Sequence, residues 1–318
     1  MVRRAVAVAL ACVVSFAGPA PRGGLSGSAG ADTGRSCVRF RLAVPGARRA
    51  EPHPLEQADA VRMLDGMRRR LAARPGLRRE PTPTSVPLWV HVVTDGRQEV
   101  PAAAITAQVE TLNAAYGGRL GGVDTGIRFD LRGVTHTANP LWFRRPLVSE
   151  AAMKQRLRKG GPETLNLYVA QLGELVLGYA TYPHWYGDRP ANDGVVIDWR
   201  SLPGGSLRDF SKGYTAVHEI GHWFGLLHTF ENGCAPPGDS IEDTPPEAMP
   251  TQGCPAQKDT CPGDGEDPFH NFMDYSHDRC MSQFTAGQAV RMREMWAAYR
   301  ASAAPPVRAG SRGNARAR

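Results

Sequence analysis

The chain has 318 residues and a formal net charge of +7, long enough for one large domain or two small ones. The charge is unevenly placed. Residues 1–84 carry 15 arginines against 6 acids and residues 301–318 carry 4 arginines and no acid, so residues 85–300 have a net charge of −6. Because this body has no positive surplus to neutralise phosphates, the composition argues against nucleic-acid binding.

The first 22 residues are typical of a secretory signal peptide. A basic start, Met1–Arg4, precedes a short apolar run from Ala5 to Ala17, and small residues at Ala17–Ala20 would permit cleavage. The apolar run is too short to span a bilayer, and no other stretch reaches that length. We therefore predict a secreted, extracellular protein without a membrane anchor.

Residues 23–84 are rich in Arg, Ala, Gly and Pro and are predicted to form a pro-segment and linker. One helix is expected within 54–73, because apolar residues recur there at near-helical spacing. Arginine runs at 48–49, 68–70 and 78–79 suggest removal by cleavage at arginine. The alternative is a disordered spacer.

Regular structure is predicted over residues 85–300. The expected elements are strands at 86–94, 127–131, 165–169 and 195–199, and helices at 101–116 and 149–159. Followed by a helix that carries the histidines of the stretch 214–228, this order predicts an α+β fold in which helices cover a twisted mixed sheet.

One stretch contains the pattern His218-Glu219-x-x-His222-x-x-Gly225-x-x-His228. On a helix, His218 and His222 lie one turn apart on the same face, where two imidazoles can bind one Zn²⁺. Glu219 lies about 100° further round and suits a base acting on metal-bound water. Gly225 can adopt the positive φ that ends a helix, so that the chain turns back and delivers His228 as a third ligand.

Three histidine ligands leave a fourth coordination position for water, as catalytic zinc sites require. The shorter pattern H-E-x-x-H has an ordinary alternative, a hydrogen-bonded histidine pair on a helix. The full eleven-residue pattern is improbable by chance in a chain with 9 histidines. We therefore predict one catalytic zinc ion.

Residues 231–270 are dense in Gly, Pro, Asp and Cys and show no periodicity, so they need covalent or ionic links to stay ordered. Two disulfides with three alternative pairings are expected from the clustered cysteines Cys234, Cys254, Cys261 and Cys280. A structural zinc site is disfavoured because no C-x-x-C spacing occurs. A final helix is expected at 285–299 with Thr285 as its N-cap, followed by a disordered basic tail at 301–318.

Two cysteines lie outside this cluster. Cys12 would leave with the signal peptide, and Cys37 falls in the expected pro-segment. One hypothesis is that the Cys37 thiolate occupies the open zinc position and keeps the precursor latent. The alternative is an incidental thiol.

The zinc motif together with Asn271-Phe-Met-Asp-Tyr275 resembles the metzincin metalloproteases, and more narrowly the secreted prokaryotic members of the pappalysin family. The resemblance extends over roughly residues 86–300. It implies a metzincin-like catalytic domain with an irregular, disulfide-linked C-terminal part that ends in a helix. It also implies that Met273 forms a tight turn beneath the zinc ligands and that Tyr275 stabilises the tetrahedral intermediate.

The same resemblance implies further features. The disulfides would be Cys234–Cys261 and Cys254–Cys280. Asp278 would lie at the base of the S1′ pocket and favour Arg or Lys at P1′, unless it is only a solvated loop carboxylate. A calcium site in the loops near the zinc would take oxygen ligands from Asp239, Asp243 and Thr244, and Glu242 is a further candidate ligand.

These features predict a secreted zinc-dependent endopeptidase, made as a zymogen and acting as a monomer on protein or peptide substrates. Its substrate would align along an exposed strand edge, for which Leu165–Val169 and Gly178–Ala180 are the candidates. Two alternatives are a zinc hydrolase acting on a non-peptide substrate and a secreted binding module with an inactive protease fold.

Overall fold

The computed structural model describes residues 52–73, 83–173, 176–263 and 265–301. The expected signal peptide, Cys37 and residues 302–318 of the expected tail lie outside these ranges. Within the described part of the chain, no helix is long and apolar enough to cross a membrane.

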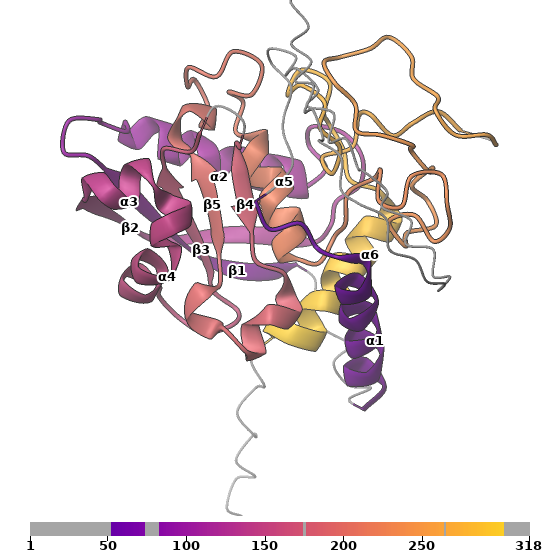
Figure 1. Ribbon diagram of the computed structural model, residues 1–318, viewed down its shortest axis with the longest axis horizontal. Helices are drawn as coiled ribbons and strands as arrows, with labels where there is room; N and C mark the ends of the chain where they lie inside the picture. Colours follow the sequence, from indigo (N-terminus) through magenta and orange to yellow (C-terminus); the bar gives the residue numbers. More distant parts are fainter. Residues whose placement is uncertain (1–51, 74–82, 174–175, 264, 302–318) are drawn as a thin grey trace, which may run out of the picture. The chain divides into compact units, whose positions relative to one another are not determined.

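A five-stranded mixed sheet in the order β2-β1-β3-β5-β4 forms the centre of the fold (Figure 1). The strands are β1 (Thr84–Thr94), β2 (Ile127–Ala138), β3 (Leu165–Ala170), β4 (Gly178–Ala180) and β5 (Val195–Asp198). The pairs that join β2, β1, β3 and β5 are parallel, and β4 pairs antiparallel to β5. Every residue of β3 and β5 is buried, as expected of parallel strands covered on both faces.

The order of the strands corrects one expectation about the exposed edge. Leu165–Val169 belongs to β3, which pairs with β1 on one side and with β5 on the other. Its backbone groups are therefore already used within the sheet, and this candidate for a substrate-binding edge is wrong. The other candidate, Gly178–Ala180, is β4 itself, the last strand of the sheet.

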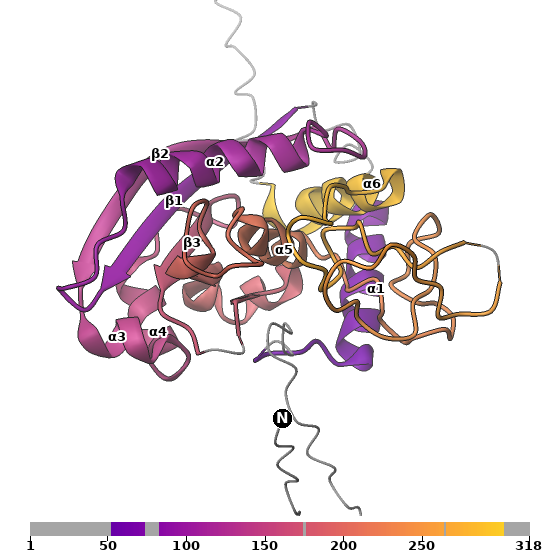
Figure 2. The same cartoon turned by 90° about the horizontal axis from the view of Figure 1, so that it is seen from above.

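Helices cover both faces of the sheet, which confirms the predicted architecture (Figure 2). On one face lie α2 (Ala102–Tyr116) and α5 (Tyr214–Trp223); on the other lie α3 (Pro140–Arg144) and α4 (Pro146–Leu157). Because side chains alternate across a strand, Leu167 and Val169 pack in the core with α2 and α5, whereas Tyr168 packs in the core with α3 and α4.

The helix expected within the pro-segment is α1 (Gln57–Ala73), and it packs against α6 (Ala286–Met295) and the π-helical turn η5 (Trp296–Arg300). The Tyr299 hydroxyl donates to the Met63 carbonyl oxygen at 2.9 Å, and the Arg70 guanidinium lies 4.7 Å from the centre of the Tyr299 ring. The first strand begins at Thr84, one residue before the expected start of the catalytic domain.

Between residues 224 and 284, the described part of the chain forms no helix or strand. Two disulfides link this part of the chain, Cys234–Cys261 and Cys254–Cys280, which are the pairs that the resemblance implies. A buried ionic group adds a further link: the Lys258 ammonium contacts the Glu247 carboxylate and lies 3.0 Å from that of Asp267. Covalent and ionic links thus order a segment that has no repeating backbone pattern.

Helix α6 begins where the sequence predicts. The Thr285 hydroxyl accepts from the Gln288 backbone N–H, and the Gln288 side chain accepts from the Thr285 backbone N–H, which completes a capping box. The helix ends at Met295 and continues as the π-turn to Arg300, whose side chain is fully buried.

Candidate active site

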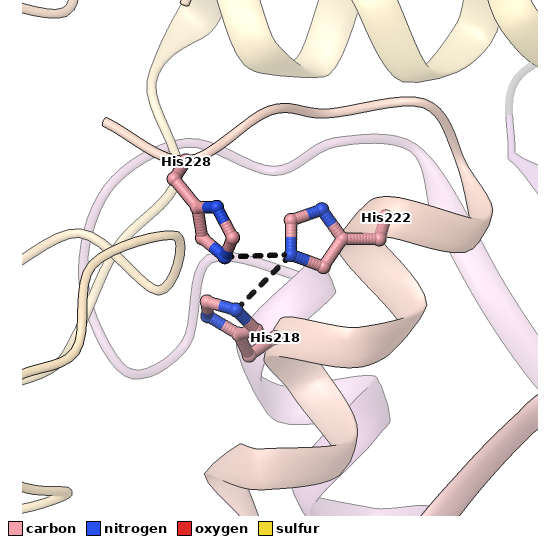
Figure 3. A group of neighbouring side chains, drawn as sticks. All are labelled: His218, His222 and His228. Atoms are coloured by element: carbon pink, nitrogen blue, oxygen red, sulfur yellow. Dashed lines mark hydrogen bonds between the residues drawn. The ribbon is translucent and has the colours of Figure 1, made fainter. Parts of the chain in front are cut away.

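All three predicted zinc ligands come from α5 and the segment that follows it (Figure 3). His218 and His222 project from successive turns of the helix. Gly225 then adopts a φ of +84°, a conformation that L side chains rarely adopt, and the chain reverses so that His228 faces the helix. A Cβ at this glycine would also lie 2.8 Å from Cγ of Met295, so both backbone and packing require glycine there.

The Nε2 atoms of the three histidines converge. His222 Nε2 lies 3.1 Å from His218 Nε2 and 3.1 Å from His228 Nε2. Tetrahedral zinc with bonds of about 2.0–2.1 Å to nitrogen places its ligand atoms about 3.3 Å apart, close to this spacing. Among the described residues, these histidines form the one group of three or more His, Cys, Asp or Glu side chains close enough to hold a metal ion.

The hydrogen bonds behind two of these rings set their protonation. His218 Nδ1 lies 2.7 Å from the Phe272 carbonyl oxygen, and His222 Nδ1 lies 2.8 Å from the Leu226 carbonyl oxygen. A carbonyl oxygen only accepts, so each neutral ring carries its proton on Nδ1 and presents a lone pair at Nε2. Two lone pairs 3.1 Å apart repel unless a cation lies between them. The donor set therefore fits zinc.

The segment Asn271–Tyr275 packs against α5, the helix that carries His218 and His222. A Cβ at Gly221 of α5 would clash with Met273 Sδ, so the helix and the segment Asn271–Tyr275 are in close contact. Met273 is fully buried, and the Asn271 carboxamide oxygen accepts from its backbone N–H at 2.9 Å. This placement of Met273 beneath the ligands is the one that the resemblance implies.

Glu219 is 1% exposed and lies against the edge strand β4. A Cβ at Gly178, the first residue of β4, would lie 2.6 Å from Glu219 Cγ and 2.8 Å from Glu219 Oε1. The strand edge and the predicted base are therefore in contact.

Gly178→Ala is expected to lower kcat by about 10- to 100-fold, because its Cβ would displace the Glu219 carboxylate by a fraction of an ångström or more. Zinc content should change little, because none of the three histidines is altered. The matched control is Gly173→Ala, whose Cβ would meet no atom within 4 Å. Equal kcat values for the two variants would contradict a tight fit between β4 and Glu219.

Tyr275 lies beside two of the predicted zinc ligands. Its ring centre is 5.0 Å from that of His228 and 5.7 Å from that of His218. Phe230 stacks on the His228 ring, with ring centres 4.6 Å apart and planes 12° apart, and its ring centre lies 4.9 Å from that of Tyr275. Packing among these aromatic rings restricts the side-chain rotation of both His228 and Tyr275.

Asp278 is buried, with an exposed fraction of 3%. Its Oδ2 accepts from the Lys212 backbone N–H at 2.7 Å, and together with the larger effect of burial its charge raises the pKa of Tyr214. Tyr214 is the first residue of α5, so the carboxylate acts on the N-terminal end of the helix that carries His218 and His222. A pocket of about 270 Å³ adjoins it, lined by Arg208, Asp209, Ser211, Lys212, Asp278 and Arg279.

The expected calcium ligands separate into two groups. The Thr244 hydroxyl contacts both carboxylate oxygens of Asp239, at 2.8 and 2.7 Å, and burial raises the pKa of Asp239 to about 7. The Asp243 carboxylate instead accepts from the Thr285 hydroxyl at 2.7 Å and from the Gly287 N–H at 2.8 Å. It therefore holds the N-terminus of α6.

Tyr182 is a residue near the metal site that sequence reasoning missed. Its hydroxyl oxygen lies 3.0 Å from His222 Nδ1. It follows β4 by two residues and lies 40 positions before the histidine it contacts, so no spacing in the sequence links the two.

Comparison with known proteins identifies the family. Residues 178–297 match the peptidase M43 family model, described as pregnancy-associated plasma protein-A. Extracellular metalloprotease 1 of Coccidioides posadasii is 42% identical over 226 residues, which cover 69% of this chain and 79% of the relative. An extracellular metalloprotease of Pyricularia oryzae is 38% identical, with coverage of 79% and 88%.

Solved structures agree with this assignment. Mature mirolysin of Tannerella forsythia, in complex with a cleaved peptide, matches with a TM-score of 0.59 and 29% identity, over 68% of this chain and 97% of that one. Promirolysin of the same organism matches with a TM-score of 0.63 and 26% identity, over 78% and 94%. The chain thus belongs to the peptidase M43, or pappalysin, family of metalloproteases and has a mirolysin-like metzincin fold.

Proposed function

We propose that this protein is a secreted zinc-dependent endopeptidase that cuts polypeptides bound along β4. One observation carries the proposal: the three Nε2 atoms converge, and Glu219, the residue that follows His218 on α5, touches the edge strand at Gly178. Metal ligands, base and a strand edge therefore meet at one place, the arrangement needed to hydrolyse an extended peptide.

Each residue has a defined task in this reaction. When bound, zinc would lower the pKa of a coordinated water to about 7 and polarise the scissile carbonyl. Glu219 takes the proton of the attacking water and later gives it to the leaving amine. Tyr275 stabilises the negative charge that develops on the carbonyl oxygen. The substrate backbone pairs with the outer edge of β4, which fixes the scissile bond over Glu219.

The decisive experiment is incubation of the purified protein with a mixture of unlabelled proteins, followed by mass spectrometry of the new termini. New internal termini that disappear with a zinc chelator and return with added Zn²⁺ are expected. A protein that binds zinc but produces no termini would favour the non-peptide hydrolase. A protein whose biological effect survives Glu219→Ala would favour the inactive binding module.

We further propose that Asp278 gives the enzyme a preference for Arg or Lys at P1′. The specificity is measured as kcat/KM for a peptide with Arg at P1′ divided by kcat/KM for the same peptide with Leu at P1′. Asp278→Asn should lower this ratio by about 10- to 100-fold, because a charge-assisted hydrogen bond to the arginine is lost. Asn retains an acceptor for the Lys212 N–H, so folding is preserved. Asp209→Asn, in the same pocket with its side chain 31% exposed, is the control. An unchanged ratio in Asp278→Asn would refute this specificity.

The proposal includes synthesis as a precursor with a signal peptide at 1–22 and a pro-segment within 23–84. The match to promirolysin covers 78% of this chain and the match to mature mirolysin 68%, which supports a precursor segment before β1. The docked α1 would belong to that segment. Cys37 is proposed as the latency switch, so Cys37→Ala should be active before processing; a latent Cys37→Ala precursor would contradict it.

A calcium ion at Asp239 and Thr244 is the last part of the proposal. Burial raises the pKa of Asp239 from 3.8 to about 7. Between these values the folded protein binds more protons at Asp239 than the unfolded one, so the contribution of this group to stability is greatest below about pH 4 and falls as pH rises to 7. A calcium ion would neutralise the carboxylate and remove this loss.

In EGTA, Asp239→Asn is therefore expected to match the parent near pH 4 and to exceed it at pH 7 by up to roughly 4 kcal/mol of unfolding free energy. Comparing variant with parent cancels the titration of other groups. Adding CaCl₂ at pH 7.5 should raise the melting temperature of the parent and leave that of the variant unchanged. A parent that does not respond to calcium has no site here.

A further inference from the structure

Tyr182 lies directly behind a predicted zinc ligand. It is 2% exposed and connects the edge strand β4 to the short helical turn η2 (Pro183–Gly187). Its hydroxyl oxygen is 3.0 Å from His222 Nδ1, and the two ring centres are 5.3 Å apart with planes inclined at 52°. The phenol therefore reaches the back of the imidazole, on the side away from Nε2.

The direction of this hydrogen bond follows from a second contact. The Leu226 carbonyl oxygen lies 2.8 Å from the same Nδ1 and can only accept. The proton is therefore on Nδ1, and the Tyr182 oxygen is its second acceptor. Two acceptors around one N–H hold the tautomer in which Nε2 carries a lone pair, the form that binds zinc.

His222 needs this support because of its position in the chain. It is the last residue but one of α5, and the helix ends before the reversal at Gly225. The Leu226 carbonyl belongs to the reversing segment itself, so its position depends on that turn. The Tyr182 hydroxyl comes instead from the end of a sheet strand, and it ties the ring to a different part of the fold.

The Tyr182 ring is itself fixed. It belongs to a buried apolar cluster that also contains Leu227, the residue before the third ligand, and Met295 of α6. Trp185 packs edge-on against it with ring centres 5.3 Å apart. A rigid phenol with one polar atom aimed at Nδ1 is suited to orient the imidazole.

We propose that Tyr182 is a positioning residue of the metal centre, which holds His222 in the orientation and tautomer that bind zinc. The inference rests on the proposed zinc site, and it does not depend on which bond the enzyme cleaves. Tyr182 would touch neither the metal nor the substrate.

Tyr182→Phe removes the hydroxyl and keeps the ring in its cluster. The dissociation constant for zinc, measured on the full chain by competition with a chromogenic chelator, should rise about tenfold, since the loss of a group that orients a metal ligand typically costs 10- to 100-fold and Leu226 remains as one acceptor. The matched control is Tyr186→Phe, whose hydroxyl accepts from Arg158 at 3.1 Å, and zinc affinity should be unchanged in it.

Two further measurements separate positioning from general destabilisation. The melting temperature of the metal-free protein should be similar in both variants, because each variant loses one hydroxyl hydrogen bond and keeps its ring. The visible absorption of the Co²⁺-substituted protein should change in Tyr182→Phe and match the parent in Tyr186→Phe, because these bands report coordination geometry. A melting temperature lowered in Tyr182→Phe alone, with an unchanged cobalt spectrum, would overturn the proposal.

Zinc affinity in Tyr182→Phe within twofold of the control would also overturn it. Failure of the proposed function gives a different result: a parent protein that binds zinc but cuts no peptide refutes the endopeptidase, while the effect of Tyr182 on zinc affinity stands. A parent that does not bind zinc refutes both.

Discussion

Glu219→Gln is expected to lower kcat/KM for an Arg-containing peptide by about 10²- to 10⁴-fold, because the carboxamide cannot accept the proton of the attacking water. Glutamine has nearly the same shape as glutamate and fits the narrow space beneath Gly178. The three histidines are untouched, so zinc content measured by atomic absorption should equal that of the parent.

The control for this variant is Glu110→Gln, an exposed side chain on α2, which should retain full activity. The combination of lost turnover and retained zinc distinguishes a missing base from a missing metal. More than a tenth of the parental kcat/KM in Glu219→Gln would show that another group accepts the proton.

Arg300→Met is expected to destabilise the protein by roughly 3–5 kcal/mol, because it leaves the Asp193 carboxylate buried without its ion-pair partner. The two side chains are fully buried and form two contacts of 3.2 Å each. The guanidinium also lies 3.5 Å from the centre of the Trp223 ring and donates to the Trp223 carbonyl oxygen at 2.9 Å. These contacts hold the π-turn η5 against the C-terminal end of α5.

An exposed pair of the same chemistry provides the comparison. Arg132 and Asp130 on β2 form an ion pair at 3.0 Å with both side chains about half-exposed, so Arg132→Met should cost no more than about 1 kcal/mol. Urea unfolding of the zinc-loaded protein measures both. Adding Asp193→Asn to Arg300→Met should recover part of the loss, since no buried charge then remains. A cost for Arg300→Met no larger than for Arg132→Met would show that the buried pair does not contribute.

Local patterns predicted most elements but not all of their lengths. β1 was expected at 86–94 and forms over Thr84–Thr94. The prediction succeeded because a β-branched, apolar run favours a strand. β2 was expected to end at residue 131, yet it continues to Ala138. Its second half is partly exposed and polar, and pairing with β1 extends it past the irregularity at Leu88–Trp89. That pairing partner is distant in sequence, so the local pattern could not show it.

The sequence by itself determined that His218, His222 and His228 come together, because a spacing of four residues on a helix and a glycine that reverses the chain act through local geometry alone. Only the tertiary structure decided that β4 is the last strand of the sheet, that Gly178 lies against Glu219 and that Tyr182 lies behind His222. The physical reason is the order of the strands: which strand ends at the edge depends on pairing between distant segments, and periodicity carries no information about it.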